Sequence, residues 1–338
     1  MKSWRFDTLG SLDGLKLHEE PIPNPGHGEV LVKMRAASLN VRDVMIAEER
    51  YPVPGKAGVI ALSDGAGDIV TLGTGVTRFK TGDRVMPTYF PQWGDGRLNF
   101  QMGADQHGCT RDGAATEYAI YHQDALVAVP EQLSYEEAAT LSCAALTAWS
   151  ALTTLPRGIL PGERILTMGT GGVPIFALQF AKTMGAEVIA LTSSPGKASR
   201  LKALGADHVI DYREHPAWEQ QIPAVTGGRG IDHIVDTGGV KTIEHSLRAV
   251  AADGQIASVG VMRGEGETID AVPLGTAYAT IRRIFVGSRA SMEAMVRAIT
   301  FHKIQPVIDH VAPFDRTDEA LREFKTAKHF GKIVLSIA

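Results

Sequence analysis

The sequence predicts an α/β protein in which a doubly wound parallel sheet accompanies a second, antiparallel β domain. From about residue 160 to residue 290, short apolar runs alternate with stretches of helical periodicity, as is typical of successive βαβ units. The first ~125 residues instead alternate apolar and polar positions, as in residues 30–34 and 117–121, and are interrupted by Pro and Gly. This second pattern indicates antiparallel, barrel-like strands.

The parallel sheet is expected to contain six strands, enough for a complete doubly wound sheet. They are predicted at residues 164–168, 187–191, 208–211, 233–236, 255–260 and 283–287. A helical pattern precedes the fifth strand. Its apolar positions are Val240, Ile243, Leu247 and Val250. Gly205 is expected to end the helix that leads into the third strand.

The end of the chain is predicted to return to the first domain. A chain of 338 residues is long enough for two hydrophobic cores, and an apolar run at residues 332–337 follows the completed parallel sheet. We therefore assign residues 1–128 and 292–338 to the antiparallel domain and residues 129–291 to the domain of the parallel sheet. Residues 92–113, rich in Gly and polar side chains, are expected to form a long loop.

Composition excludes several classes of protein. Apolar residues make up 44% of the chain and the formal net charge is -4, which is typical of a cytosolic enzyme and not of a nucleic-acid binder. We expect a cytoplasmic protein with no membrane partner, because the start is not signal-like and no run of ~18 apolar residues occurs. Cys109 and Cys143 are expected to be free thiols, although one disulfide is arithmetically possible.

A glycine-rich turn after the first parallel strand predicts a dinucleotide-binding site. The residues expected to hold the diphosphate are Gly169, Thr170, Gly171, Gly172 and Val173. Glycines let the backbone approach a pyrophosphate closely, and the amino terminus of the following helix favours its negative charge. Pro174 replaces the usual third glycine, which the first turn of a helix tolerates. A plain strand-to-helix turn is the alternative.

The end of the second parallel strand indicates NADP(H) rather than NAD(H). An acidic residue there would bind the ribose hydroxyls of NAD, and none is present. The residues expected to hold a 2′-phosphate are Thr192, Ser193, Ser194, Lys197 and Arg200. In the alternative, Ser194 caps a helix that begins at Pro195, and the two cations face solvent.

Glycines also follow the fourth and fifth parallel strands. Ligands of open α/β sheets bind at the carboxyl ends of the strands, so Gly238, Gly260 and Val261 are expected near the nicotinamide half of the cofactor. Tight turns alone are the alternative explanation for these glycines.

With these motifs in place, the chain resembles the medium-chain dehydrogenase/reductase superfamily, and within it the zinc-independent members similar to quinone oxidoreductases. The motifs that carry the resemblance are residues 28–32 (GEVLV), 37–43 (ASLNVRD), 63–67 (SDGAG), 82–85 (GDRV), 113–118 (GAATEY) and 146–149 (LTAW). The resemblance implies a GroES-like β-barrel domain, a Rossmann domain and an active site in the cleft between them. It also implies a homodimer joined through the edge segment at residues 281–287.

The catalytic zinc of related dehydrogenases is expected to be absent. By the resemblance, the three ligand positions correspond to Asn40, Ser63 and Cys143, of which the first two are unsuited to zinc. Cys143 is then interpreted as a small buried residue. Cys109 is the sole cysteine in the segment that could carry a structural zinc, and His107 beside it does not complete a site.

Without a metal, hydrogen-bond donors must stabilise the oxygen that becomes negative during hydride transfer. Tyr51 is the first candidate, because it resembles a tyrosine that quinone reductases carry in the loop facing the nicotinamide; surface packing is its alternative. Asn40 is a second donor candidate, and Asp43 is expected to orient its neighbours. For Arg42 and Asp43 the alternative is an ion pair on the surface.

Further side chains near the predicted long loop are candidates for lining an acceptor pocket, with ordinary packing as the alternative. They are Tyr89, Trp93, His107 and Cys109. Lys332 matches a cationic position of the family, and solvent exposure is equally compatible with it.

The expected function is NADPH-dependent transfer of hydride to an α,β-unsaturated carbonyl compound or a quinone, without a metal. Conjugate reduction needs less electrophilic activation than direct oxidation of an alcohol, which relies on a Lewis acid. Two alternatives stay open: a zinc-independent NAD(P)-dependent alcohol dehydrogenase or carbonyl reductase, and a non-catalytic NADPH-binding protein.

Overall fold

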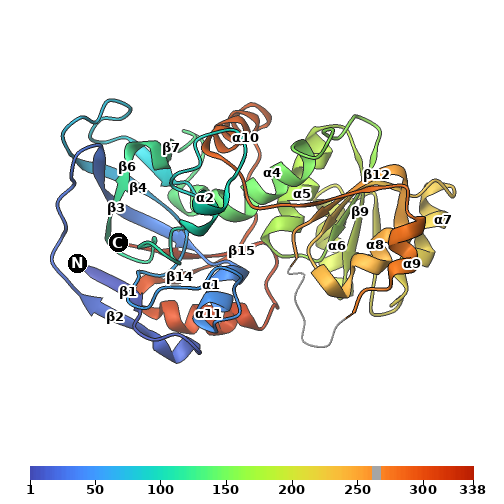
Figure 1. Ribbon diagram of the computed structural model, residues 1–338, viewed down its shortest axis with the longest axis horizontal. Helices are drawn as coiled ribbons and strands as arrows, with labels where there is room; N and C mark the ends of the chain where they lie inside the picture. The colour runs from blue at the N-terminus through green and yellow to red at the C-terminus, as the bar shows by residue number, and fades with distance from the viewer. Residues whose placement is uncertain (261–267) are drawn as a thin grey trace. The chain divides into compact units, whose positions relative to one another are not determined.

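The structure is a computed structural model that describes residues 1–260 and 268–338 (Figure 1). It divides into two compact units, Met1–Leu146 with Gly287–Ala338, and Thr147–Val286. The first boundary therefore falls after Leu146 and not after residue 128 as predicted, and the chain returns to the first unit at Gly287. Residues 129–146 belong to the first unit because they bond to its sheet; the Ser38 hydroxyl, for example, donates to the Ala139 carbonyl at 2.8 Å.

The first unit is built on a seven-stranded sheet with the order β14-β15-β3-β4-β5-β7, in which β6 also pairs with β3. These strands are β3 (Glu29–Ser38), β4 (Asp64–Leu72), β5 (Arg84–Pro87), β6 (Tyr118–His122), β7 (Leu126–Ala128), β14 (Ile308–Pro313) and β15 (Lys332–Ser336). Strands β1 (Lys2–Phe6) and β2 (Leu15–Glu19) form a separate antiparallel pair. All pairs are antiparallel except β14 with β15.

Helices and a π-helical turn accompany this sheet. They are α1 (Val41–Ala47), α2 (Phe100–Ala104), α3 (Tyr135–Ala138), the π turn Leu141–Ala145, α10 (Arg289–His302) and α11 (Thr317–Lys325). Helix α2 interrupts residues 92–113, which were predicted to be loop throughout. The core of the unit contains Phe6, Val32, Met34, Ile69 and Leu335.

The last strand lies inside the first unit, as predicted. Strand β15 pairs antiparallel with β3, with Val334 opposite Ser38. Figure 1 accordingly draws the blue amino-terminal strands and the red β15 in the same unit. The pairing is possible because residues 333–335 are apolar and become fully buried between their neighbours.

The second unit is a six-stranded parallel sheet with the order β10-β9-β8-β11-β12-β13. Its strands are β8 (Arg164–Met168), β9 (Glu187–Thr192), β10 (His208–Asp211), β11 (Ile231–Asp236), β12 (Val250–Ser258) and β13 (Thr280–Arg283). The described helices of this part of the chain are α4 (Leu146–Thr153), α5 (Gly172–Thr183), α6 (Pro195–Ala203), α7 (Ile222–Thr226), α8 (Ile243–Ala249) and α9 (Ala271–Thr276). The predicted architecture, a doubly wound parallel sheet plus a second domain built mainly of antiparallel strands, is confirmed.

The first four predicted parallel strands agree with the structure to within two residues, and the last two differ more. Strands β8 and β10 have the predicted bounds, and β12 begins at Val250, earlier than predicted. The edge strand was predicted at residues 283–287 and lies instead at Thr280–Arg283. Val286 has a φ of 46°, a left-handed conformation that is incompatible with an extended strand.

Both cores follow from the apolar strand positions. In the second unit Leu166, Ile189, Ile210, Ile234 and Ile256, one from each of five neighbouring strands, are buried together. Within the described residues, no helix has the length and apolar character needed to cross a membrane.

Candidate functional site

The turn between β8 and α5 has the geometry of an anion-binding cradle. Gly169 has a φ of 83° and is tied to the neighbouring strand by its N–H, which donates to the Leu191 carbonyl at 2.9 Å. A Cβ atom placed on Gly169 or Gly171 would meet no described atom within 4 Å, so the backbone faces open space. Helix α5 begins at Gly172, and no side chain caps it at Gly171. Its first N–H groups are therefore available to a phosphate, as the glycine motif predicts.

The turn after β9 carries the residues predicted to hold a 2′-phosphate. Helix α6 begins at Pro195 with Ser194 at the N-cap position, but the Ser194 side chain makes no capping hydrogen bond. The helix start of the alternative is therefore observed, but without its capping hydrogen bond. Thr192 is buried and accepts the Ser194 N–H at 3.4 Å, Ser193 and Lys197 are partly buried, and Arg200 is exposed.

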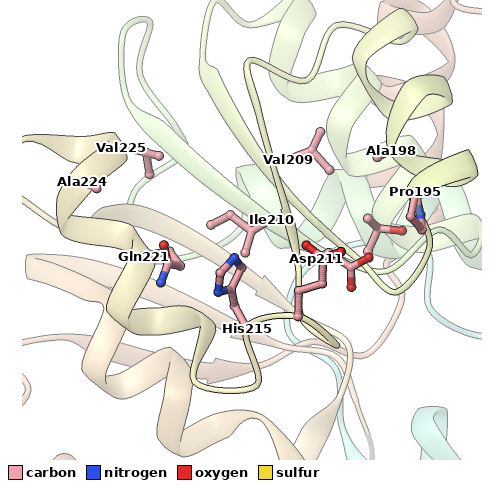
Figure 2. Close-up of a pocket in the computed structure, with 11 residues that line it drawn as sticks. Pro195, Ala198, Val209, Ile210, Asp211, His215, Gln221, Ala224 and Val225 are labelled. Atoms are coloured by element: carbon pink, nitrogen blue, oxygen red, sulfur yellow. The ribbon is translucent and has the colours of Figure 1, made fainter.

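A cavity of about 410 Å³ lies next to this turn, between β10, α6 and α7 (Figure 2). Thr192, Pro195 and Ala198 line it from the β9 side. The other lining residues are Val209, Ile210, Asp211, Glu214, His215, Gln221, Ala224 and Val225. None of these eight was predicted as a site residue. Asp211, Glu214 and His215 could have been found from their place at or just after the carboxyl end of the third parallel strand, where ligands of such sheets bind.

Asp236, at the carboxyl end of β11, organises the loop that follows it. One carboxylate oxygen accepts the N–H groups of Gly238 and Gly239, at 3.1 and 3.0 Å, and the Thr242 hydroxyl at 2.6 Å. The other oxygen accepts the Ser246 hydroxyl at 2.7 Å. Asp236 is fully buried, so it fixes this end of the sheet. Asp236 was not predicted as a site residue, although an acid two residues before the Gly238-Gly239 pair is a recognisable turn signal.

The two predicted glycines in this region are explained by packing. A Cβ atom on Gly238 would lie 2.4 Å from a Thr242 side-chain carbon, and one on Gly260 would lie 2.2 Å from the Gly239 nitrogen. Close approach of loops therefore requires both glycines, in line with the tight-turn alternative. Val261 lies outside the described residues.

In the first unit, strand register brings Lys332 and Asn40 together. Val334 of β15 is opposite Ser38 of β3, and just past the end of β3 the backbone N–H of Leu39 donates to the Ile333 carbonyl at 3.1 Å, which brings the next residue of each segment close. The Lys332 Nζ donates to the Asn40 Oδ1 at 2.6 Å and to the Leu39 carbonyl at 2.5 Å. Lys332 is only 2% exposed, so the solvent-exposed alternative is wrong.

Asn40 and Asp43 sit at the start of α1 and are buried. The Asp43 carboxylate accepts the backbone N–H of Asn40 at 2.8 Å and a bond from the Arg42 guanidinium at 3.2 Å. Arg42 and Asp43 are 5% and 0% exposed, so they are not the surface ion pair of the alternative. Burial raises the pKa of Asp43 to about 6, against the opposing effect of Arg42. The Nδ2 of Asn40 is buried and has no hydrogen-bond partner among the described residues.

Tyr51 belongs to a hydrogen-bonded chain that leads into the protein. Its hydroxyl lies 2.7 Å from the Tyr89 hydroxyl, which donates to the Gln106 Oε1 at 3.1 Å. Arg42 donates to the same oxygen, and its guanidinium carbon lies 4.8 and 5.4 Å from the ring centres of Tyr89 and Tyr51. Tyr51 is half-buried and bonded, so the surface-packing alternative does not describe it.

The remaining pocket-lining candidates divide by exposure. Tyr89, His107 and Cys109 are buried, which agrees with the packing alternative, and Trp93 is partly exposed. His107 bonds through Nδ1 to the Asp112 carbonyl at 3.1 Å, and burial lowers its pKa to about 4. Both cysteines are free thiols, as predicted.

The three positions that correspond to zinc ligands are engaged with protein groups. The Ser63 hydroxyl donates to Asp64 at 2.7 Å, and the backbone N–H of Cys143 donates to the other Asp64 oxygen at 3.1 Å. Asn40 accepts from Lys332. Cys143 is partly exposed, and not buried as predicted. In the part of the chain that the structure describes, no three His, Cys, Asp or Glu side chains group together as metal ligands.

Comparison with known proteins places this geometry in a family. Two family models match the chain, an alcohol dehydrogenase GroES-like domain at residues 26–131 and a zinc-binding dehydrogenase domain at residues 172–300. A zinc-type alcohol dehydrogenase-like protein of Schizosaccharomyces pombe is 41% identical over 98% of this chain and 97% of its own length. The chain belongs to the medium-chain dehydrogenase/reductase superfamily. It is therefore an oxidoreductase of a family that binds nicotinamide cofactors.

Other members of the superfamily show the range of activities among similar proteins. A structure of an NAD-dependent alcohol dehydrogenase has a TM-score of 0.90 and 31% identity, with all of both chains covered. A quinone oxidoreductase of Pseudomonas syringae pv. Tomato DC3000 has a TM-score of 0.82 and 28% identity over 99% of both chains. A mycobacterial protein complexed with NADPH has a TM-score of 0.83 and 26% identity over 99% of this chain and 100% of its own. An acryloyl-coenzyme A reductase of Metallosphaera sedula is 28% identical over 97% of this chain and 98% of its own.

At the three positions that correspond to zinc ligands, the described residues of this medium-chain dehydrogenase/reductase do not fit zinc well. The Asn40 amide oxygen is bonded to the Lys332 ammonium, and the Ser63 hydroxyl donates to Asp64. Of the three side chains at these positions, Cys143 is therefore the one whose type binds zinc. The cradle at Gly169 and Gly171 does fit a dinucleotide, because its glycines leave open space beside a helix amino terminus.

Proposed function

We propose that this chain is an NADPH-dependent oxidoreductase that transfers hydride to an α,β-unsaturated carbonyl compound or a quinone without a metal. One observation carries the proposal: the Nδ2 of Asn40 is a buried hydrogen-bond donor with no partner among the described residues, at a position where zinc-dependent relatives place a ligand. An unused buried donor costs stability, and a ligand that accepts from it would remove this cost.

The cofactor half of the proposal rests on the second unit. NADPH would be held with its diphosphate at the Gly169–Gly171 turn and its 2′-phosphate near Ser193, Ser194 and Lys197. The lining of the adjacent cavity includes the carboxylates of Asp211 and Glu214, which disfavour a phosphate and suit the neutral adenine better. When bound, the cofactor supplies the hydride.

The acceptor half of the proposal rests on the first unit. Addition of hydride to an enone or a quinone places negative charge on an oxygen, and a fixed N–H donor stabilises that charge. The amide of Asn40 can serve in this way without losing an internal bond of its Nδ2. Tyr51 is a weaker candidate than expected, because its hydroxyl already bonds to Tyr89. Asp43 and Lys332 hold Asn40 in place.

A second candidate function is metal-free oxidation of alcohols or reduction of carbonyls. It is favoured by the similarity to the NAD-dependent alcohol dehydrogenase and to the S. pombe relative. Against it stand Asn40 and Ser63, which are poorly suited to hold the Lewis acid that alcohol chemistry uses more heavily than conjugate reduction does.

The decisive experiment follows NADPH and NADH oxidation in parallel, with chelator-treated protein, against enones, quinones and aldehydes. We expect turnover of an enone or a quinone with NADPH, and a saturated ketone as the product of an enone. Reduction of cofactor by a secondary alcohol, with no enone or quinone turnover, would favour the second function. Tight NADPH binding without turnover of any acceptor would favour a non-catalytic protein.

The expected homodimer is also a proposal. Strand β13 is an edge of the parallel sheet, and Tyr278, Ile281 and Phe285 beside or within it are 84%, 39% and 54% exposed. An exposed edge with apolar side chains is a typical pairing surface. Light scattering should report twice the chain mass, and Ile281→Lys should lower it to one chain mass; a monomeric parent protein would refute the dimer.

A further inference from the structure

We propose that the Lys332 ammonium takes the place of the catalytic metal: it fills the space where the ligand positions converge and orients the Asn40 amide. That Lys332 occupies this space does not depend on the proposed function. The use of the Asn40 amide as a hydrogen-bond donor to the acceptor does rest on the proposed function.

The topology makes the ligand positions converge on Lys332. Strand β3 pairs with β15 on one side, where Val334 is opposite Ser38, and with β4 on the other, where Asp64 is opposite Ser38. Residues that follow Ser38 and residues next to Asp64 therefore meet at the end where β15 begins. The π-helical turn adds Cys143, whose N–H bonds to Asp64. Three segments far apart in sequence, the end of β3 with the start of α1, the start of β4 and the π-helical turn, thus lie near the one cation that β15 contributes.

The charges around Lys332 explain why a cation belongs there. Asp43 and Asp64 are both 0% exposed, and buried carboxylates need a nearby positive charge. Arg42 partly meets this need at Asp43, but its other bonds run to Gln106 and the His107 carbonyl. Burial lowers the pKa of Lys332 while Asp64, Cys143 and Asp43 raise it, so these groups are its electrostatic neighbours.

Lys332 also decides which way the Asn40 amide points. An ammonium group has donors only, so the amide atom bonded to it at 2.6 Å must be the oxygen. The Nδ2 then points away from Lys332, and it is this atom that has no partner. If the amide were flipped, the NH₂ group of Asn40 would face the Lys332 ammonium, and two donors would meet without an acceptor. Lys332 is accordingly a positioning residue, which acts through Asn40.

The first test asks whether Lys332 blocks a metal. In the full chain, Asn40→Cys with Ser63→His restores, beside Cys143, three side chains of the types that bind zinc. While Lys332 is kept, we expect fewer than about 0.1 zinc per chain, because its ammonium group would lie beside the three ligands and repel a dication. Adding Lys332→Met should raise this to about one, whereas adding Lys80→Met, at an exposed lysine, should not. Elemental analysis and chelator competition measure this without any assay of activity.

Two results of this test would overturn the proposal. If the Asn40→Cys, Ser63→His chain binds zinc as tightly with Lys332 as without it, the ammonium does not fill the space. If the folded chain with Lys332→Met added binds no zinc, the positions do not converge.

The second test uses the enzyme without engineered ligands, in case those variants fail to fold. Lys332→Met and Asn40→Ala should each lower kcat about 100-fold and leave the NADPH Kd within about threefold of the parent value, and the double variant should be no slower than Asn40→Ala alone. Lys332→Arg should recover part of kcat. A Lys332→Met variant that mainly weakens NADPH binding, or losses that multiply in the double variant, would refute positioning through Asn40. If the parent protein turns over no acceptor, the proposed function fails while the zinc test still decides what fills the space.

Discussion

The hydroxyl oxygens of Tyr51 and Tyr89 lie 2.7 Å apart, and Gln106 decides which of them donates. The Gln106 amide is fixed, since its Nε2 donates to the Gly103 carbonyl and its Oε1 accepts from Arg42. Tyr89 therefore donates to this Oε1, and the proton of Tyr51 points to Tyr89. Tyr51 cannot donate to a substrate without breaking this bond.

It follows that Tyr51→Phe should lower kcat by no more than about fivefold, because the lost bond is internal. Asn40→Ala should lower kcat about 100-fold, as loss of an oxyanion donor does. Steady-state kinetics with the best acceptor compare the two variants. Should Tyr51→Phe prove the more damaging of the pair, Tyr51 is the donor and the role given to Asn40 is wrong.

Gly171→Ala tests the cofactor cradle without disturbing the fold. Gly171 has a φ of -77° and its added methyl group would meet no described atom, so the melting temperature should change by less than about 2 °C. The same methyl group would occupy the space expected for the diphosphate, and we expect NADPH affinity to fall at least about tenfold in a calorimetric titration. Gly275→Ala, in α9 and also with open space, is the matched control and should bind normally. Unchanged affinity in Gly171→Ala would place the diphosphate elsewhere.

Ser194→Asp tests the preference for NADPH. Asp is as good an N-cap residue as Ser, so helix α6 should persist. The new carboxylate would repel a 2′-phosphate and could accept ribose hydroxyls, so the ratio of NADPH to NADH affinity should fall about tenfold or more. Ser199→Asp adds the same charge at an exposed position of α6 and serves as the control. An equal effect of both variants would mean that only net charge matters.

The burial of His107 predicts sensitivity to acid. Its folded pKa is lowered to about 4 from the ordinary value of 6.5, so the unfolded chain binds more protons between these values. The stability that neutral His107 contributes is present above pH 6.5 and is lost as pH falls toward 4, by at most about 3 kcal/mol. His107→Gln should flatten the dependence of unfolding free energy on pH in this window, measured by denaturant titration. An unchanged slope would show that His107 is protonated in the folded protein.

The Asp236 network predicts a large loss of stability on truncation. Asp236→Ala would leave two backbone N–H groups and two hydroxyls without their buried acceptor, at a cost of roughly 2–5 kcal/mol. Asp236→Asn keeps one acceptor oxygen and should cost less. Thermal and chemical unfolding measure both. A loss below about 1 kcal/mol in Asp236→Ala would indicate that water replaces the carboxylate.

The local pattern of the sequence was enough to predict the parallel sheet and its glycine turn. Periodicity along a strand or helix records which face is buried, so β8 and β10 have the predicted bounds and α5 begins at Gly172. The edge strand lies at Thr280–Arg283, earlier in the chain than predicted. The left-handed backbone of Val286 excludes an extended strand there, and sequence periodicity does not report backbone conformation.

The candidate site in the first unit was predicted only as a set of residue types. Asn40, Asp43 and Lys332 were named, but their burial and the bond between Asn40 and Lys332 join residues that lie 292 positions apart. That contact exists because β15 pairs with β3 in one register, and a shift by one residue would turn Lys332 to the other face. The sequence alone thus determined the fold class, the glycine turn after β8 and the presence of an amide and a hydroxyl, Asn40 and Ser63, at two of the expected ligand positions. Tertiary structure alone decided that an ammonium group lies beside Asn40, because the burial and partners of a polar side chain depend on chains of contacts that no local pattern encodes.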